Sequence, residues 1–105
     1  NDRTIFAFNE KLSPVQVAIF PLVNKEGMPE LAEKVYKILK PSFKCFYDES
    51  GSIGRRYRRM DEIGTPFCIT VDGDSLKDKT VTLRERDSMK QIRIKIDDLI
   101  KELKK

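Results

Sequence analysis

The sequence predicts an α/β fold, a five-stranded mixed sheet with three helices. Short apolar segments alternate with amphipathic segments over residues 15–71, a pattern typical of parallel strands joined by right-handed crossovers. Strand-like segments then follow one another with no long helical segment between them, which indicates some antiparallel pairing. The length of 105 residues is enough for one domain and too short for two.

The predicted domain begins after a polar segment. Residues 1–13 are polar and mixed, and we expect a linker or an arm that leads into a domain over residues 14–105. The chain starts at Asn1 rather than at Met, which suggests a fragment or a processed product. Residues 15–20 are apolar at nearly every position, as in a strand buried on both faces, and Pro21 ends this strand.

The first predicted helix lies between two prolines. Pro29 suits the first helical position, because the N–H that proline lacks would have no partner there. Leu31, Val35 and Ile38 recur at helical spacing and predict the buried side of the helix. Pro41 stops it.

Two further strands flank the second predicted helix. Residues 44–47 form a short second strand, and residues 67–71 form an apolar third strand. Between them, residues 52–63 predict a helix with apolar side chains at i, i+4 and i+7. The predicted buried stripe consists of Ile53, Tyr57 and Met60.

The last third of the chain predicts two alternating strands and a closing helix. The third strand is closed by a turn at residues 72–74. Residues 80–85 alternate in polarity, which predicts a strand with one wetter face. After a turn at residues 86–88, residues 91–95 alternate again, and residues 97–105 predict the third helix.

The composition excludes several classes of protein. The chain has no His, which removes the commonest general base, the Ser-His-Asp and Cys-His systems and His-based metal sites. Cys45 and Cys68 cannot supply a four-thiolate zinc site, and both lie in apolar segments, so we expect reduced, packed thiols in a cytoplasmic protein. No apolar run approaches the ~18 residues of a membrane span, so we expect no membrane partner.

The most concentrated charge lies in the second predicted helix. Four of the eight arginines fall within residues 55–59, in a chain of formal net charge +4. A turn of 100° per residue directs Arg55, Arg58, Arg59 and Glu62 to solvent together, with Arg56 nearer the buried edge. Arginine suits bidentate recognition of phosphates and base edges, so we interpret this face as RNA-contacting. The alternative is a solvated helix face with weak intrahelical pairs.

Two other patterns carry less information. The Gly-rich turn at residues 50–54 offers a phosphate cradle at a helix start, or else a turn that needs positive φ. It lacks the Lys-Ser/Thr ending of a P-loop. The acidic residues at 72, 74 and 78 lack the ligand spacing of a calcium loop, so we expect no metal site.

Two motifs resemble a known family. Residues 48–67 (DESGSIGRRYRRMDEIGTPF) and 81–93 (VTLRERDSMKQIR) strongly resemble the C-terminal anticodon-binding domain of glycyl-tRNA synthetases of the dimeric type. The resemblance runs from about Pro14 to the end. It implies the same mixed sheet and a tRNA partner. It also implies a homodimeric class II parent that joins glycine to tRNA with ATP and magnesium in an upstream catalytic domain. The 105 residues would then hold no cofactor and no catalytic residue.

The resemblance also implies a set of RNA-binding positions. The start and exposed face of the second helix and the strand after it line the anticodon loop in related domains, and the second motif adds residues with either a base-contacting or a structural role. Carried onto this chain, these positions are Arg55, Arg58, Arg59, Glu62, Thr65, Phe67, Arg84, Arg86 and Asp87. Glycine anticodons share two cytosines, and a carboxylate beside an arginine suits the pairing edge of cytosine. We therefore expect Glu62 and Arg59 to read cytosine.

Two alternatives to tRNA recognition remain at the level of sequence. The accessory subunit of the mitochondrial DNA polymerase uses this fold without catalysis, so an accessory or interaction module is the second hypothesis. A stand-alone enzyme is the third, and the absence of His argues against it.

Overall fold

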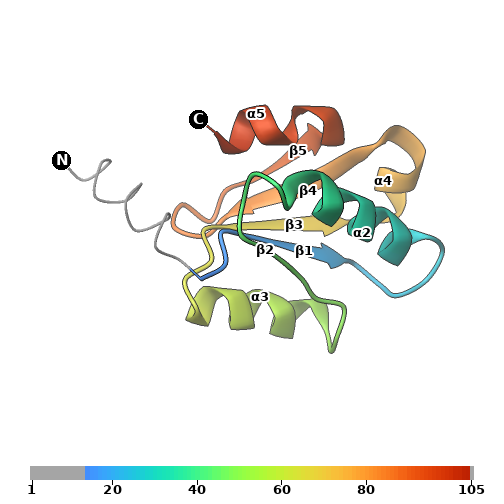
Figure 1. Cartoon of the computed structure of the whole chain (residues 1–105). Coiled ribbons are helices and arrows are strands. Elements are labelled where there is room, and N and C mark those ends of the chain that lie inside the picture. Colours follow the sequence, from blue (N-terminus) through green and yellow to red (C-terminus); the bar gives the residue numbers. More distant parts are fainter. Residues whose placement is uncertain (1–13, 105) are drawn as a thin grey trace.

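The computed structural model describes residues 14–104 as one five-stranded sheet with helices on both faces (Figure 1). The predicted linker at residues 1–13 lies outside the described residues. In chain order the elements are β1 (Val17–Pro21), α2 (Met28–Leu39), β2 (Cys45–Tyr47), α3 (Ile53–Glu62), β3 (Phe67–Val71), α4 (Gly73–Asp78), β4 (Thr80–Glu85), β5 (Gln91–Lys95), the 3-10 turn η1 (Ile96–Asp98) and α5 (Leu99–Leu103).

The sheet has the order β2-β1-β3-β4-β5, and its pairing is mixed. β1 is parallel to both β2 and β3, whereas β4 is antiparallel to β3 and to β5. The crossover from β1 to β2 and the crossover from β2 to β3 run in opposite directions along the sheet. Because both are right-handed, α2 and α3 cover opposite faces. The predicted mixed five-stranded sheet is confirmed.

Each face of the sheet packs its own hydrophobic core. Val17 and Ile19 of β1 join the larger core under α2 and α5, on one face. Ala18 and Phe20 alternate to the other face and pack with Met60 of α3. Figure 1 shows α3 alone on its side of the sheet, with α2, α4 and α5 on the other side. The small core under α3 therefore fixes the helix that carries the arginines.

The described residues contain four α-helices, so the prediction of three was wrong. The additional helix is α4, where the sequence predicted only a turn. Asp72 accepts from the Ser75 N–H and the Ser75 side chain accepts from the Asp72 N–H, which closes a capping box. A six-residue helix shows too few apolar repeats for periodicity to reveal it. Ile38 was also misplaced, since it is exposed and Leu39 is buried instead.

The two cysteines lie on opposite faces of the sheet and cannot pair. Cys45 is opposite Val17 in the β1–β2 register, whereas Cys68 is opposite Ala18 in the β1–β3 register. Both are free thiols. Burial raises the pKa of Cys45 to about 11 and that of Cys68 to about 12, so neither is a reactive thiolate at neutral pH.

Candidate nucleic-acid interface

One half of the sheet is left uncovered on the side of α3. The β4–β5 register pairs Thr82 with Arg93 and Arg84 with Gln91, and these side chains point to the same face as Phe20 and Met60. α3 packs over β1 and β3 on that face, and in the described part of the chain no helix packs over β4 and β5 there. We call this surface the open face. Its polar side chains belong to Thr80, Thr82, Arg84, Gln91, Arg93 and Lys95.

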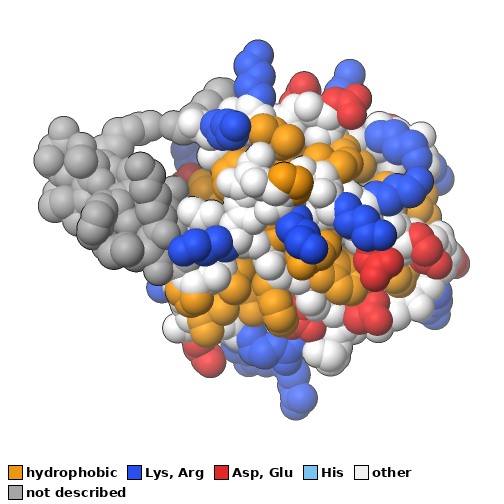
Figure 2. All heavy atoms as spheres, viewed as in Figure 1, with side chains coloured by type: hydrophobic (Ala, Val, Ile, Leu, Met, Phe, Trp, Pro, Cys, Tyr) orange, Lys and Arg blue, Asp and Glu red, His pale blue; other side chains and the backbone are white. Residues whose placement is uncertain are grey.

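α3 borders the open face and presents a basic outer surface. The Ser52 hydroxyl caps the helix by accepting from the Arg55 N–H at 3.3 Å. Arg55, Arg58 and Glu62 are exposed, as helical periodicity predicts. Figure 2 shows Lys and Arg side chains projecting along the edge of the molecule where Figure 1 places α3. Arg58 and Glu62 have no ion-pair partner among residues 14–104, so they are available to a ligand.

Arg59 is exposed, but its guanidinium is engaged within the domain. Its Nε and Nη2 donate to Asp48 Oδ2 at 3.1 and 2.7 Å, and Nη2 also donates to the Ser50 carbonyl at 2.9 Å. Arg59 thus binds the segment before α3 rather than joining Glu62. The structure leaves the predicted cytosine-reading pair unassembled.

The partner carboxyl of Arg59 is held in its charged form. Asp48 is only 6% exposed, and burial alone would raise its pKa. Hydrogen bonds from the Ser50 N–H, the Ser50 hydroxyl and Arg59 outweigh that effect and lower the pKa below its usual value. The Asp48–Arg59 ion pair is therefore a fixed part of the domain at neutral pH.

Arg56 is buried and holds four backbone carbonyls together. Its Nη1 donates to Pro21 at 2.6 Å and to Asp48 at 3.2 Å, and its Nη2 reaches Gly51 at 3.4 Å and Leu22 at 3.5 Å. Arg56 joins α3 to the end of β1 and to the turn at residues 48–51. The position nearer the buried edge, predicted from the helical turn, is confirmed.

The turn that opens α3 adopts a glycine-dependent conformation. Gly51 has φ +71°, a region that other residues rarely adopt, and its carbonyl accepts from Arg56. The positive-φ interpretation of residues 50–54 is thereby confirmed. A phosphate cradle at the same turn stays a prediction.

The β4–β5 hairpin is fastened to the end of α3. Arg84 is 8% exposed and lies over the Tyr57 ring, 4.8 Å from its centroid. Its Nη1 is 3.5 Å from Asp61 Oδ1. Arg86 Nε donates to the Asp61 carbonyl at 3.3 Å, and its Nη1 pairs with Asp87 at 3.0 Å. Asp61 therefore connects the C-terminal end of α3 to the hairpin.

The nine positions implied by the family resemblance divide by exposure. Arg55, Arg58, Glu62 and Asp87 are exposed, Arg59 is exposed but paired, and Arg86 is half-buried. Arg84 lies at the junction of α3 with the open face. Thr65 is fully buried, and its hydroxyl faces Met60 Sδ at 3.7 Å. Phe67 packs against the core on the other side of the sheet. The structure thus does not gather these nine side chains on one surface.

Sequence reasoning missed several polar residues beside this site. Asp61 lies between the predicted positions of α3, and Gln91, Arg93 and Lys95 lie on the open face. The alternation of residues 91–95 was a signal for them, because it places every second side chain on one face. Residues 14–104 contain no cluster of acidic or thiol side chains arranged to hold a metal ion. None of the helices in that range has the length and apolar character needed to cross a membrane.

Arg93 braces the outer strand of the open face. Its Nη1 and Nη2 donate to the two carboxylate oxygens of Asp72 at 2.6 and 2.8 Å, and its Nε donates to Thr80 Oγ1 at 2.8 Å. These bonds tie β5 to the first turn of α4. The Arg93 hydrogen bonds lower the pKa of Asp72 to about 2.

Asp72→Asn is expected to lower the free energy of unfolding by about 1–2 kcal/mol at pH 7, after allowance for partial exposure. Asn preserves the helix cap but loses the ion pair. Because the folded-state pKa is lowered from 3.8 to about 2, the stabilisation is complete above about pH 4 and disappears as the pH falls through about 2. Urea unfolding from pH 7 to pH 2 measures it.

The matched control is Asp74→Asn, two residues further along α4 and exposed. It should change stability by less than about 0.5 kcal/mol. An Asp72→Asn protein that kept the full acid dependence of the wild type between pH 4 and pH 2 would contradict this assignment.

Comparison with known proteins defines the class of protein to which this fold and surface belong. The family model described as "Anticodon binding domain" matches residues 16–105. The chain belongs to this family of anticodon-binding domains. The RNA binding domain of threonyl-tRNA synthetase from Cryptosporidium parvum Iowa II superposes with a TM-score of 0.79 at 27% identity, covering 90% of this chain and 24% of that one. A prolyl-tRNA synthetase from Cryptosporidium parvum superposes with a TM-score of 0.81 at 24% identity, covering 90% of this chain and 22% of that one. At this low identity the likeness shows a shared fold.

Curated relatives narrow the family to the anticodon-binding domains of one group of enzymes. The glycine–tRNA ligase of Rhodopirellula baltica is 56% identical over 101 residues, 96% of this chain and 19% of that protein. The glycine–tRNA ligase of Methanococcus vannielii is 59% identical over 105 residues, which cover 99% of this chain and 18% of that protein. The glycine–tRNA ligase of Ruminiclostridium cellulolyticum is 60% identical over 97 residues, which cover 92% of this chain and 21% of that protein. The resemblance to the anticodon-binding domain of glycyl-tRNA synthetases is confirmed, and the chain spans about a fifth of the length of these relatives.

Proposed function

We propose that this chain binds the anticodon loop of glycine tRNA on the open face and on the adjoining surface of α3. The observation that carries the proposal is the side-by-side placement of two kinds of surface. Arg55 and Arg58 supply exposed cations for the RNA backbone. The open face supplies hydroxyl, amide and guanidinium groups for base edges, and it has no covering helix within residues 14–104.

The wider activity follows from the relatives and forms part of the same proposal. The protein acts as a glycine–tRNA ligase in the cytoplasm, as a homodimer. Glycine is joined to tRNA with ATP and magnesium in a catalytic domain outside these 105 residues. The residues described above contribute binding and no chemical step. The relatives named above are tRNA ligases, which favours this function over a polymerase accessory subunit.

Binding of a glycine anticodon stem-loop by the full chain is expected to weaken steeply with salt. Log K against log salt should slope negatively by a few units, since each neutralised phosphate contributes about 0.7 in single-stranded RNA. Arg58→Ala should weaken binding to every anticodon variant alike and reduce the slope by about 0.7. Fluorescence anisotropy across a salt series measures both quantities.

Lys37→Ala is the control, because Lys37 is an exposed cation on α2, on the opposite side of the sheet. It should leave the affinity and the slope unchanged. A salt-independent affinity, or equal effects of the two substitutions, would place the RNA elsewhere.

A further inference from the structure

We propose that Asp61 and Arg84 together form a cytosine-reading subsite. The sequence had led us to expect Glu62 and Arg59 in this role. The inference rests on the proposed function and names the side chains that give it base specificity. Asp61 is absent from the nine positions implied by the family motifs. The structure brings it to the junction of α3 with the open face, beside the arginine on β4.

The two side chains are adjacent but weakly paired. Arg84 Nη1 is 3.5 Å from Asp61 Oδ1, at the limit of a hydrogen bond. The Asp61 side chain is 37% exposed, so its oxygens reach solvent. The Arg84 side chain is 10% exposed, and its guanidinium carbon lies over the Tyr57 ring, 4.8 Å from the ring centroid. A ligand can therefore meet a partly exposed carboxylate beside a largely buried cation.

The Arg84 guanidinium makes fewer hydrogen bonds than the guanidinium groups of Arg56, Arg59 and Arg93. Both Nη groups of Arg56 donate to backbone carbonyls, although its buried Nε has no partner. Arg59 binds Asp48 through two nitrogens, and Arg93 holds both oxygens of Asp72. A guanidinium carries five N–H donors. With described residues, Arg84 makes only the long contact to Asp61 and a bond of 3.2 Å from Nη2 to the sulfur of Met89, a weak acceptor. A largely buried cation with so few acceptors favours a ligand that brings one.

The pairing edge of cytosine fits this arrangement. Its 4-amino group donates to a carboxylate, while N3 and O2 accept from a guanidinium. Uracil places a carbonyl where cytosine has the amino group and an N–H where cytosine has N3. The Asp61 carboxylate would then face an acceptor, and the Arg84 guanidinium would face a donor. The pair consequently selects cytosine over uracil.

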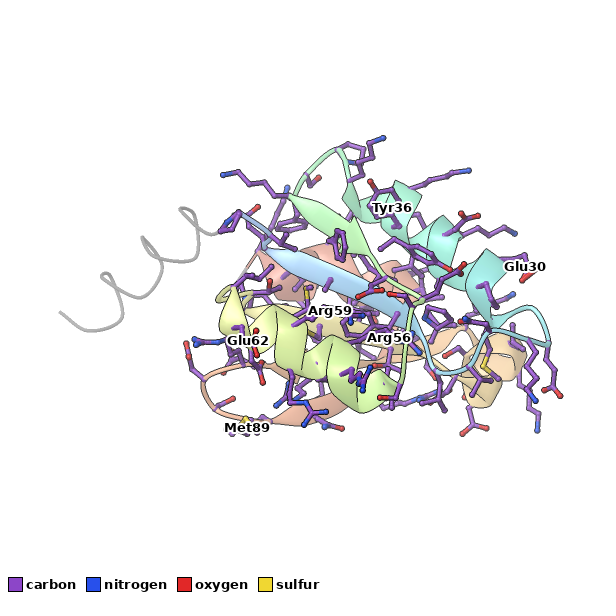
Figure 3. The ribbon with its side chains drawn as sticks, turned by 90° about the horizontal axis from the view of Figure 1, so that it is seen from below. Glu30, Tyr36, Arg56, Arg59, Glu62 and Met89 are labelled. Carbon is purple, nitrogen blue, oxygen red and sulfur yellow. The ribbon has the colours of Figure 1, made fainter. Side chains whose placement is uncertain are left out.

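Met89 completes the subsite with an apolar surface. It lies on the β4–β5 hairpin with φ +60° and is 62% exposed, while its sulfur accepts from Arg84. Figure 3 shows Met89 on the hairpin near the end of α3, where Glu62 also lies. The exposed thioether side chain offers a contact for the face of a base held by Asp61 and Arg84.

The test measures binding of the full chain to glycine anticodon stem-loops with cytosine or uracil at each of the two shared positions. Asp61→Asn should reduce the preference for cytosine over uracil at one position by about tenfold, the size of one good base contact. Because the Asn amide can donate to the uracil carbonyl, the substitution should lower the ratio of cytosine affinity to uracil affinity, and not only the affinity for cytosine. Glu62→Gln tests the rival reader on α3. The control is Glu30→Gln, an exposed carboxylate on α2 on the opposite side of the sheet, which should leave the ratio unchanged.

A second measurement needs no substitution in the protein. Pyrimidin-2-one keeps N3 and O2 of cytosine but lacks the 4-amino group. At the position read by Asp61, this base should weaken wild-type binding by about tenfold. The subsite is refuted if the wild type prefers cytosine while Asp61→Asn keeps that preference, if Glu62→Gln abolishes it instead, or if pyrimidin-2-one binds as well as cytosine. A wild-type chain that binds no stem-loop at low salt refutes the proposed function itself.

Discussion

Arg56→Met is expected to lower the free energy of unfolding by about 2–5 kcal/mol, because it removes the buried donors of several backbone carbonyls. Met fills much of the same volume, so the loss reports chiefly on polar groups. Without the guanidinium, the carbonyls of Pro21 and Asp48 lose a buried donor, and each costs about 1–3 kcal/mol if it stays unsatisfied. Urea unfolding of the 105-residue chain measures the change.

Arg58→Met is the matched control, since Arg58 lies two residues away on the exposed side of α3. It should change stability by less than about 0.5 kcal/mol. Equal losses at the two positions would mean that Arg56 is not the residue that holds α3 to the end of β1. The assignment of the buried side of this helix would then be wrong.

The element order could be predicted because its signals are local. The apolar runs that become β1 and β3, and the prolines that bound α2, act over a few residues. α4 escaped prediction because its stability comes from a capping box and from the Arg93 bonds to Asp72, not from an apolar stripe. Arg93, which bonds the capping residue Asp72 of this helix, lies 21 positions further along the chain. An analysis of the local sequence around α4 therefore misses this contact.

The exposure of the arginines could be predicted, but their partners could not. Helical geometry alone places Arg58 outward and Arg56 near the sheet. Nothing in the spacing shows that Arg59 binds Asp48, eleven positions earlier, because that contact depends on the path of the turn at residues 48–51. The pairing of Arg84 with Asp61 spans 23 positions and needs β4 beside β3. Long-range partners decide which arginines remain available to RNA.

The open face was predicted only in part. The alternation of residues 80–85 predicted one wetter face, and this agrees with the structure, in which Val81 and Leu83 are buried and Thr80 and Thr82 are half-buried. Which helix covers which strand depends on the order β2-β1-β3, which sends α3 over β1 and β3 and leaves β4 and β5 bare on that side. Strand order is a property of the whole chain, so a segment-by-segment analysis misses it.

Met60→Ala is expected to lower the free energy of unfolding by about 2–5 kcal/mol, as for other truncations in a packed core. Met60 is 3% exposed and belongs to the small cluster under α3 with Ala18, Phe20 and Cys68. Truncation also takes the sulfur acceptor from the fully buried Thr65 hydroxyl. Met60→Leu keeps the volume and should cost less than about 1.5 kcal/mol. Urea unfolding compares both with Ile63→Ala, a truncation at a side chain that is 44% exposed. An Ile63→Ala loss as large as that of Met60→Ala would show that the cluster under α3 does not hold this helix on the sheet.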